Sequence, residues 1–186
     1  IFENCFSLAK VTLPSSIISI SCTAFHGITQ LSITGDIQHI PSSSFRYSSK
    51  LEKIVFNTPK LTSFGSYVFD GCSSLTEITL PSSVQKFENN SFQGVSKLTI
   101  SGEIQNIPNE TFKNCSSLSE IKLNTNSLTT IGVSAFEECT SLTEINLPSS
   151  IISIEKDAFK GIRILTINGD IQHLPNNSFK GCSSLQ

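Results

Sequence analysis

The stretch that decides the fold is FDGCSSLTEITLPSSVQKFENNSF, residues 69–92. Leu75, Ile78 and Leu80 follow the pattern L-x-x-I-x-L, and alternation along a strand places Ile78 and Leu80 on one face and the residues between them on the other. A bend with the sequence Pro-Ser-Ser follows, and Phe92 begins a new copy of the same pattern. The chain is therefore expected to consist of repeated strand-and-return units.

The phenylalanine that opens each unit recurs along the whole chain at intervals of 23, 20 and 24 residues, in that order. This column contains Phe2, Phe25, Phe45, Phe69, Phe92, Phe112, Phe136, Phe159 and Phe179. One cycle of three units spans 67 residues, which is also the spacing of Pro14, Pro81 and Pro148. Periods of 20 to 24 residues are typical of leucine-rich repeats, in which each turn buries its apolar side only against its neighbours.

These patterns predict one domain over residues 1–186, with about eight full repeats of 20–24 residues and a ninth cut off at Leu185. The strands are expected to begin at Leu8, Ile28, Leu51, Leu75, Val95, Leu118, Leu142 and Ile162. We expect a right-handed leucine-rich-repeat solenoid, in the α/β repeat class, with a parallel concave β-sheet and short helical or extended return segments on the convex side. Both ends fall within a repeat, which suggests a fragment of a longer protein.

The combined pattern L-x-x-I-x-L-P-x-S-[IV]-x-x-I-x-x-x-[AS]-F-x-x-C-x-x-L resembles the BspA-like, or treponemal-type, leucine-rich repeats. Residues 75–98 and 142–165 follow it nearly position by position. The resemblance implies a surface-exposed or secreted protein of a bacterium or a parasitic protist that adheres to host cells or matrix proteins. It implies no ligand site, because the motif consists of core residues.

Composition narrows the classes of function. Lys and Arg number 13 against 15 Asp and Glu, so the net charge of -2 offers no basic excess for nucleic acid or anionic lipid. No apolar run is long enough to span a bilayer, so direct membrane insertion is not expected in this fragment, and no leader peptide opens the chain at Ile1. The serines lie in repeating bends, whereas a catalytic residue should be singular. We therefore expect no enzyme, no catalytic residue and no cofactor.

Six cysteines raise the question of disulfides or zinc. Five of them stand three residues after the column phenylalanine, where other units carry Ile or Val: Cys5, Cys72, Cys115, Cys139 and Cys182. A position that accepts Ile, Val or Cys is most simply a core position, so we expect reduced core thiols. No C-x-x-C pair suggests zinc. Cys22 lies outside the column and is the expected reactive thiol.

Two histidines, His39 and His173, share a repeat position near the acidic Asp36 and Asp170. Glu103 stands at the matching acidic position between them, one 67-residue cycle from each of Asp36 and Asp170. Equivalent points three turns apart are separated by about 14 Å, too far for shared coordination. We therefore interpret these residues as solvated turn residues rather than metal ligands.

The outward strand positions are the best candidates for partner binding. They include Lys10, Gln30, Lys53, Val55, Glu77, Thr79, Lys97, Thr99, Glu120, Lys122, Glu144, Asn146 and Ile164. A plainer interpretation is a polar face with stabilising cross-strand pairs, such as Lys97 between Glu77 and Glu120. Since no exposed aromatic cluster is evident in the sequence, partner contact is expected to be broad and fairly polar.

The favoured function is adhesion through a protein or glycan ligand of host cells or matrix, by a cell-surface or secreted protein. The alternative is a cytoplasmic leucine-rich-repeat scaffold, which reduced cysteines would favour. N-glycosylation sequons occur at Asn89, Asn109, Asn114 and Asn176, and three of the four share a return-side position that leaves the strands clear. The oligomeric state is not predicted by the sequence.

Overall fold

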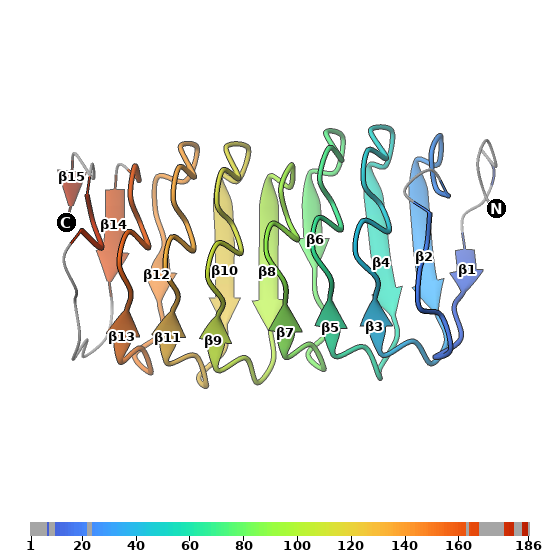
Figure 1. The fold of residues 1–186 in the computed structure, drawn as a ribbon, viewed down its shortest axis with the longest axis horizontal. Helices are drawn as coiled ribbons and strands as arrows, with labels where there is room; N and C mark the ends of the chain where they lie inside the picture. The colour runs from blue at the N-terminus through green and yellow to red at the C-terminus, as the bar shows by residue number, and fades with distance from the viewer. Residues whose placement is uncertain are drawn as a thin grey trace.

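A computed structural model of the chain describes residues 7, 10–21, 24–162, 164–167, 177–180 and 184–185. One strand of each turn lies in a row of parallel strands that runs the length of the molecule (Figure 1). These are β1 (Lys10–Thr12), β2 (Gln30–Thr34), β4 (Lys53–Asn57), β6 (Glu77–Thr79), β8 (Lys97–Ser101), β10 (Glu120–Asn124), β12 (Asn146–Leu147), β14 (Ile164–Ile167) and β15 (Ser184–Leu185). The repeat predicted the order and approximate position of the long strands, of which the first eight begin two to four residues after their expected starts.

Short strands on the return side form a second set. They are β3 (His39–Ile40), β5 (Ser63–Phe64), β7 (Lys86–Phe87), β9 (Asn106–Ile107), β11 (Thr130–Ile131) and β13 (Ser153–Ile154). They pair in parallel as β3-β5-β7 and β9-β11-β13, in front of the long strands in Figure 1. With a strand on both sides of each turn, the described residues form a parallel β-solenoid, which is the expected leucine-rich-repeat architecture.

The return segments differ from the prediction in one respect, because the described part of the chain contains no α-helix. Turns surround each column phenylalanine from Phe25 to Phe179 instead. Around Phe45, for example, Ser43 and Tyr47 both have a φ of 61°, in the left-handed region, which a helix of L-residues cannot continue through. The amide of Phe45 donates to the carbonyl of Val68 in the next turn at 3.0 Å, so the backbone bonds across turns rather than along a helix.

The same left-handed position, two residues after the column phenylalanine, recurs along the solenoid. In four units it is occupied by a glycine with positive φ: Gly27, Gly71, Gly94 and Gly161. Glycine adopts this conformation at little steric cost. The repeated glycine was therefore a sequence signal for a turn in place of a helix.

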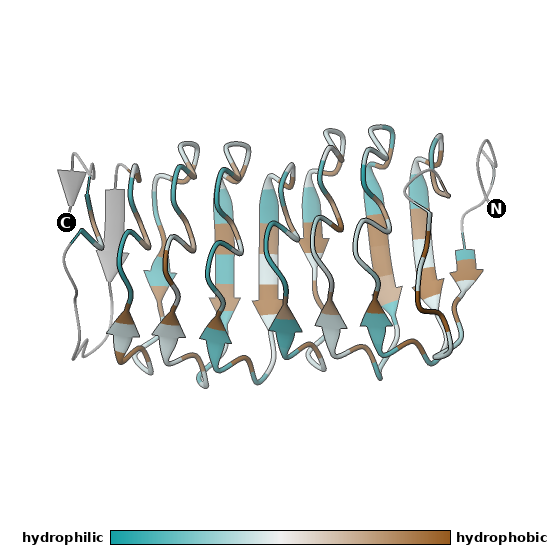
Figure 2. Ribbon diagram, viewed as in Figure 1, coloured by the Kyte–Doolittle hydropathy of each residue, from teal (hydrophilic) through white to brown (hydrophobic). Residues whose placement is uncertain are grey.

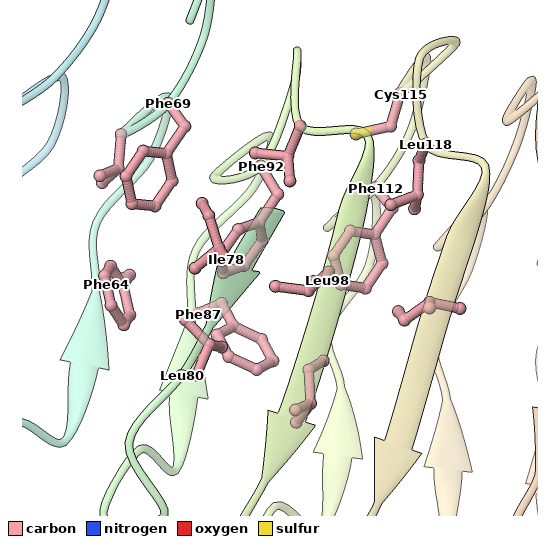
Figure 3. Packing of buried hydrophobic residues seen from close by; sticks show 14 of the residues in the cluster. Phe64, Phe69, Ile78, Leu80, Phe87, Phe92, Leu98, Phe112, Cys115 and Leu118 are labelled. Atoms are coloured by element: carbon pink, nitrogen blue, oxygen red, sulfur yellow. The ribbon is translucent and has the colours of Figure 1, made fainter. Parts of the chain in front are cut away.

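The column phenylalanines form the aromatic core. From Phe25 to Phe159 each is fully buried, and successive ring centroids lie 4.9 to 5.8 Å apart. Figure 3 shows Phe69, Phe92 and Phe112 in the interior, with Phe64 and Phe87 of the short strands packed against them. The prediction of a buried phenylalanine column is confirmed for these residues. Figure 2 shows the accompanying alternation of apolar and polar residues along the long strands.

Three cysteines in the described residues are buried and free: Cys72, Cys115 and Cys139. The thiol of Cys72 donates to the carbonyl of Phe45 at 2.9 Å. Burial raises the pKa of Cys72 and of Cys139 to about 12. The prediction of reduced core thiols is thus confirmed for these three. Cys5, Cys22 and Cys182 lie outside the described residues.

Candidate binding face on the long strands

The outward side chains of the long strands form an ordered polar surface, here called the strand face. It comprises Lys53, Val55, Glu77, Thr79, Lys97, Thr99, Glu120, Lys122, Glu144 and Asn146. The neighbours on each strand, such as Ile78 and Leu98, are buried, because alternate residues of a strand point to opposite sides.

The ladder register places four charges in one row. Lys53 lies opposite Glu77, Glu77 opposite Lys97, and Lys97 opposite Glu120. The sign of the charge therefore alternates from strand to strand. Positive and negative groups are presented at a spacing of about 4.8 Å, the distance between neighbouring strands.

The N-terminal end of the predicted row is shifted. Lys10 lies opposite Ser32 rather than Gln30, whereas Gln30 lies opposite Lys53 as expected. A shift of two residues keeps every side chain on its own face, so the apolar pattern cannot distinguish the two registers. At the other end, Ile164 lies opposite Ser184, and its side chain is outside the described part of the structure.

The ion pairs on the strand face also differ from the expected arrangement. Glu120 lies between two lysines, 3.2 Å from Lys97 and 2.9 Å from Lys122. The hydrogen bond from Lys122, and then that from Lys97, lowers the pKa of Glu120. Lys97 was expected to bridge Glu77 and Glu120, but the described residues show only its pair with Glu120. These groups are solvent-exposed, so the pairs contribute little stability and are available to a partner.

Two hollows of about 400 Å³ open on the strand face. One is lined by residues 52–55, 76, 77 and 79, and the other by residues 119–122, 143, 144 and 146 together with Lys97. Apart from Lys97, the two linings are related by the 67-residue period. A smaller hollow of about 180 Å³ lies between them, over Lys97 and Glu120.

The pairing of the strands explains the position of the large hollows. β4 and β6 share a single pair, Lys53 with Glu77, and the described residues show no ladder between β10 and β12. Both gaps in the ladder occur at the 24-residue step of the repeat, where the next long strand is short and ends at Thr79 or at Leu147. The superperiod thus produces two equivalent indentations that the sequence analysis did not predict.

A second surface feature was also missed. Tyr47 and Tyr67, with 53% and 39% of their surface exposed, flank an ion pair in which Arg46 Nε donates to Asp70 Oδ2 at 2.8 Å. These four residues, here called the tyrosine cluster, lie on the turns around the column phenylalanines. The expectation that no exposed aromatic cluster exists is therefore wrong. They are the only tyrosines in the chain, which was the available signal.

Of the remaining candidates, Asp36 lies in a bend, whereas His39 belongs to β3 and not to the expected turn. His39 Nδ1 lies 2.8 Å from Ser63 Oγ, and Asp36 pairs with Lys60 at 3.1 Å. Among the residues that the structure describes, no three His, Cys, Asp or Glu side chains gather as metal ligands would. His173 and Asp170 lie outside those residues.

The sequon asparagines lie on the return side where they are described. Asn89, Asn109 and Asn114 are exposed, and the side-chain oxygen of Asn109 accepts a hydrogen bond from the Val133 amide at 2.9 Å. Asn176 is not among the described residues. No helix in the described part of the chain is long and apolar enough to cross a membrane.

Comparison with solved structures shows the fold. A leucine-rich repeat protein from Eubacterium ventriosum aligns over 97% of this chain and 60% of its own, at 18% identity and a TM-score of 0.70. The chain thus spans less than two thirds of that protein. A chain of the Drosophila Toll–Spatzle complex aligns over 87% of this chain and 23% of its own, at 18% identity and a TM-score of 0.53.

A leucine rich cell surface protein from Faecalibacterium prausnitzii aligns over 100% of this chain and 73% of its own, at 17% identity, but its TM-score of 0.41 is too low to carry an argument. No curated protein matches the sequence. The profile described as BspA type Leucine rich repeat region (6 copies) matches residues 1–115 and 105–186. The chain therefore belongs to the BspA-type leucine-rich-repeat family.

Proposed function

We propose that this chain is the binding module of a cell-surface or secreted protein, and that its strand face attaches to a protein of host cells or of their matrix. The observation that carries the proposal is the strand face itself, with its alternating charges and its two equivalent hollows. Solenoids of this type use their extended sheet surfaces for binding. Family membership supports a surface location.

The chemistry of the strand face suits recognition of a protein surface. Between Lys53 and Asn146 the face extends over about 20 Å, at the usual strand spacing. Its charges lie at the surface, where they promote fast and selective association more than tight binding. Val55, 38% exposed, adds an apolar contact beside the first hollow. A partner with a complementary row of charges would fit this face.

The test is a charge-reversal experiment with a matched control. The variant Lys53→Glu with Lys97→Glu reverses two charges on the strand face, whereas Lys86→Glu with Lys156→Glu reverses two exposed charges elsewhere. Both change the net charge equally. Binding to immobilised fibronectin, laminin and fibrinogen, and to cultured epithelial cells, is measured by biolayer interferometry and by adhesion counts. We expect the strand-face variant to lose about tenfold or more in affinity, or about 1.4 kcal/mol, with unchanged melting.

Three results would contradict the proposal. If the unmodified chain binds none of these probes, the proposal that it attaches to a host protein is wrong. An equal loss in the control pair would mean non-specific charge attraction. Unaltered binding in the strand-face variant would place the site elsewhere.

A cytoplasmic scaffold is the second candidate, favoured by the free thiols of Cys72, Cys115 and Cys139. Their burial keeps them unreactive in either compartment, which weakens this argument. Mass spectrometry of the native protein distinguishes the two candidates. N-glycans at Asn89, Asn109 or Asn114 would exclude the cytoplasmic scaffold.

A further inference from the structure

The tyrosine cluster is a compact group formed by two neighbouring turns. The guanidinium carbon of Arg46 lies 4.6 Å from the ring centroid of Tyr47 and 5.2 Å from that of Tyr67. These are cation–π distances. The carboxylate of Asp70 balances the positive charge of Arg46, and its hydrogen bond raises the pKa of Arg46. The cluster is therefore neutral overall, and its rings are held in place by the cation beside them.

The internal duplication provides a natural control for this cluster. Residues 67 positions later repeat the ion pair, with Lys113 3.1 Å from Glu137. The positions of Tyr47 and Tyr67, however, are occupied in that copy by Asn114 and Ser134. The ion pair is common to both copies, whereas the tyrosines occur in one. The two copies therefore show that these turns form without the aromatic rings.

The left-handed backbone at the two tyrosines belongs to the repeat and not to the rings. Their φ values are 61° and 56°, and Asn114 and Ser134 of the other copy have φ values of 59° and 53°. Asparagine tolerates this conformation better than tyrosine does, so the backbone does not account for a tyrosine at residue 47.

A glycine makes room for the Tyr47 ring. A Cβ atom placed on Gly71 would lie 2.6 Å from Tyr47 Cδ1, closer than real contacts allow. In the other copy this position is Glu138, beside Asn114. Glycine also occupies this repeat position as Gly27, Gly94 and Gly161, in units that contain no tyrosine. Gly71 therefore permits the Tyr47 ring, although glycine at this position is a feature of the repeat.

We propose that the tyrosine cluster is a carbohydrate-binding site for a neutral sugar, separate from the strand face. The π-face of a tyrosine ring carries negative electron density and attracts the polarised C–H groups on the apolar face of a pyranose. Arg46 has N–H donors, and Asp70 has acceptor positions, beyond those used in their own bond, and these suit a pair of sugar hydroxyls. Because the charges already balance, the site favours a neutral ligand over an ionic one.

The chain has a built-in reporter for this site. It contains two tyrosines and no tryptophan, so tyrosine emission comes from the cluster alone. The emission is followed while the chain is titrated with neutral oligosaccharides of glucose, galactose, mannose and N-acetylglucosamine. Sialyllactose and heparin fragments are the charged comparisons, and decaproline tests a peptide occupant. We expect a saturable change with at least one neutral oligosaccharide, at an affinity that varies little with salt.

Replacing each tyrosine by the residue found at its position in the other copy makes the test specific. Tyr67→Ser leaves Tyr47 as the reporter, and Tyr47→Asn leaves Tyr67. Each is expected to weaken sugar binding about tenfold or more, by calorimetry and by emission. Ile152→Ser removes a comparably exposed apolar side chain, 46% exposed, and should leave sugar binding unchanged.

The proposal is overturned if no neutral oligosaccharide changes the emission up to about 10 mM. It is also overturned if only the charged sugars or decaproline bind, or if both tyrosine variants keep full affinity. Should a variant unfold, ¹³C-tyrosine NMR of the unmodified chain still shows whether the sugar shifts the two ring signals. Failure here leaves the strand-face proposal standing, since it uses different residues and different probes.

Discussion

Removal of one ring from the middle of the phenylalanine column tests the packing of the whole solenoid. Phe92 is fully buried, and its ring centroid lies 5.8 Å from that of Phe69, 5.5 Å from Phe112, 6.0 Å from Phe64 and 5.4 Å from Phe87. Phe92→Ala would leave a cavity bounded by these four rings. Stacked turns on both sides fix the neighbours, so we expect little collapse into the space.

The expected loss is about 3–5 kcal/mol in the free energy of unfolding, as for other buried Phe→Ala changes. A domain has only about 5–15 kcal/mol in total, so a large share is removed. With a urea m-value of about 2 kcal/mol/M, the midpoint should fall by about 2 M. Because each turn contacts only its neighbours, the transition should also broaden or split as the two halves uncouple.

The matched control is Phe179→Ala, in the same column near the end of the described chain. Phe179 is half-buried and stacks on Phe159 at 5.8 Å. Phe179→Ala should lower the urea midpoint by less than half as much as Phe92→Ala does. Urea unfolding followed by far-ultraviolet circular dichroism gives both values. Equal midpoints for the two variants would refute the argument that the central column carries the stability.

Three further predictions concern single groups. Hydrogen bonds from Lys160 and Ser134 lower the pKa of Glu137 from 4.5 to about 2, so its stabilising effect is complete above about pH 4.5 and is lost as the pH falls towards 2. Glu137→Gln should therefore lower the melting temperature at pH 6 and lose that deficit near pH 2, whereas parallel pH curves would contradict the assignment. Burial should keep the thiols of Cys72, Cys115 and Cys139 unmodified by iodoacetamide at pH 8 until urea is added, as peptide mass spectrometry would show. Rapid labelling of the folded chain would argue against their burial. Gly102→Ala should lower the stability of the chain by more than about 1 kcal/mol, because the new Cβ would lie 2.3 Å from Ser82 O and the backbone φ is 143°. Gly94→Ala, whose Cβ would have its nearest contact at 3.3 Å, should lower the melting temperature less. The reverse order in thermal melting would refute this reasoning.

The sequence was sufficient for the features that depend on local periodicity. The spacing of the phenylalanines predicted a solenoid of stacked turns with a buried aromatic column, and alternation along residues 77–80 predicted which side chains are buried and which form the strand face. A strand reverses the direction of its side chains at every residue whatever lies beside it, so this information is present in the chain itself. The core positions of three cysteines followed from the same argument.

The apolar pattern left the backbone between the strands open, and the predicted helical turns are wrong for that reason. On the return side the apolar residues are spaced by three and then five, as in Ile37, Ile40 and Phe45. This spacing fits a helical turn or a pair of left-handed residues around Phe45 equally well. Hydrogen bonds to the next turn decide between them, as from Phe45 to Val68. Such bonds exist only after the turns have stacked.

The functional surfaces also required the tertiary structure. Stacking brings together residues separated by 20 to 27 positions, and small differences in register decide which of them meet. Glu120 contacts Lys97 and Lys122, and Arg46 contacts Asp70 and both tyrosines, although no short segment of sequence contains either group. The sequence by itself thus determined which residues face outward. Only the stacked turns decided which outward residues lie together, because contact across turns depends on register rather than on alternation within a strand.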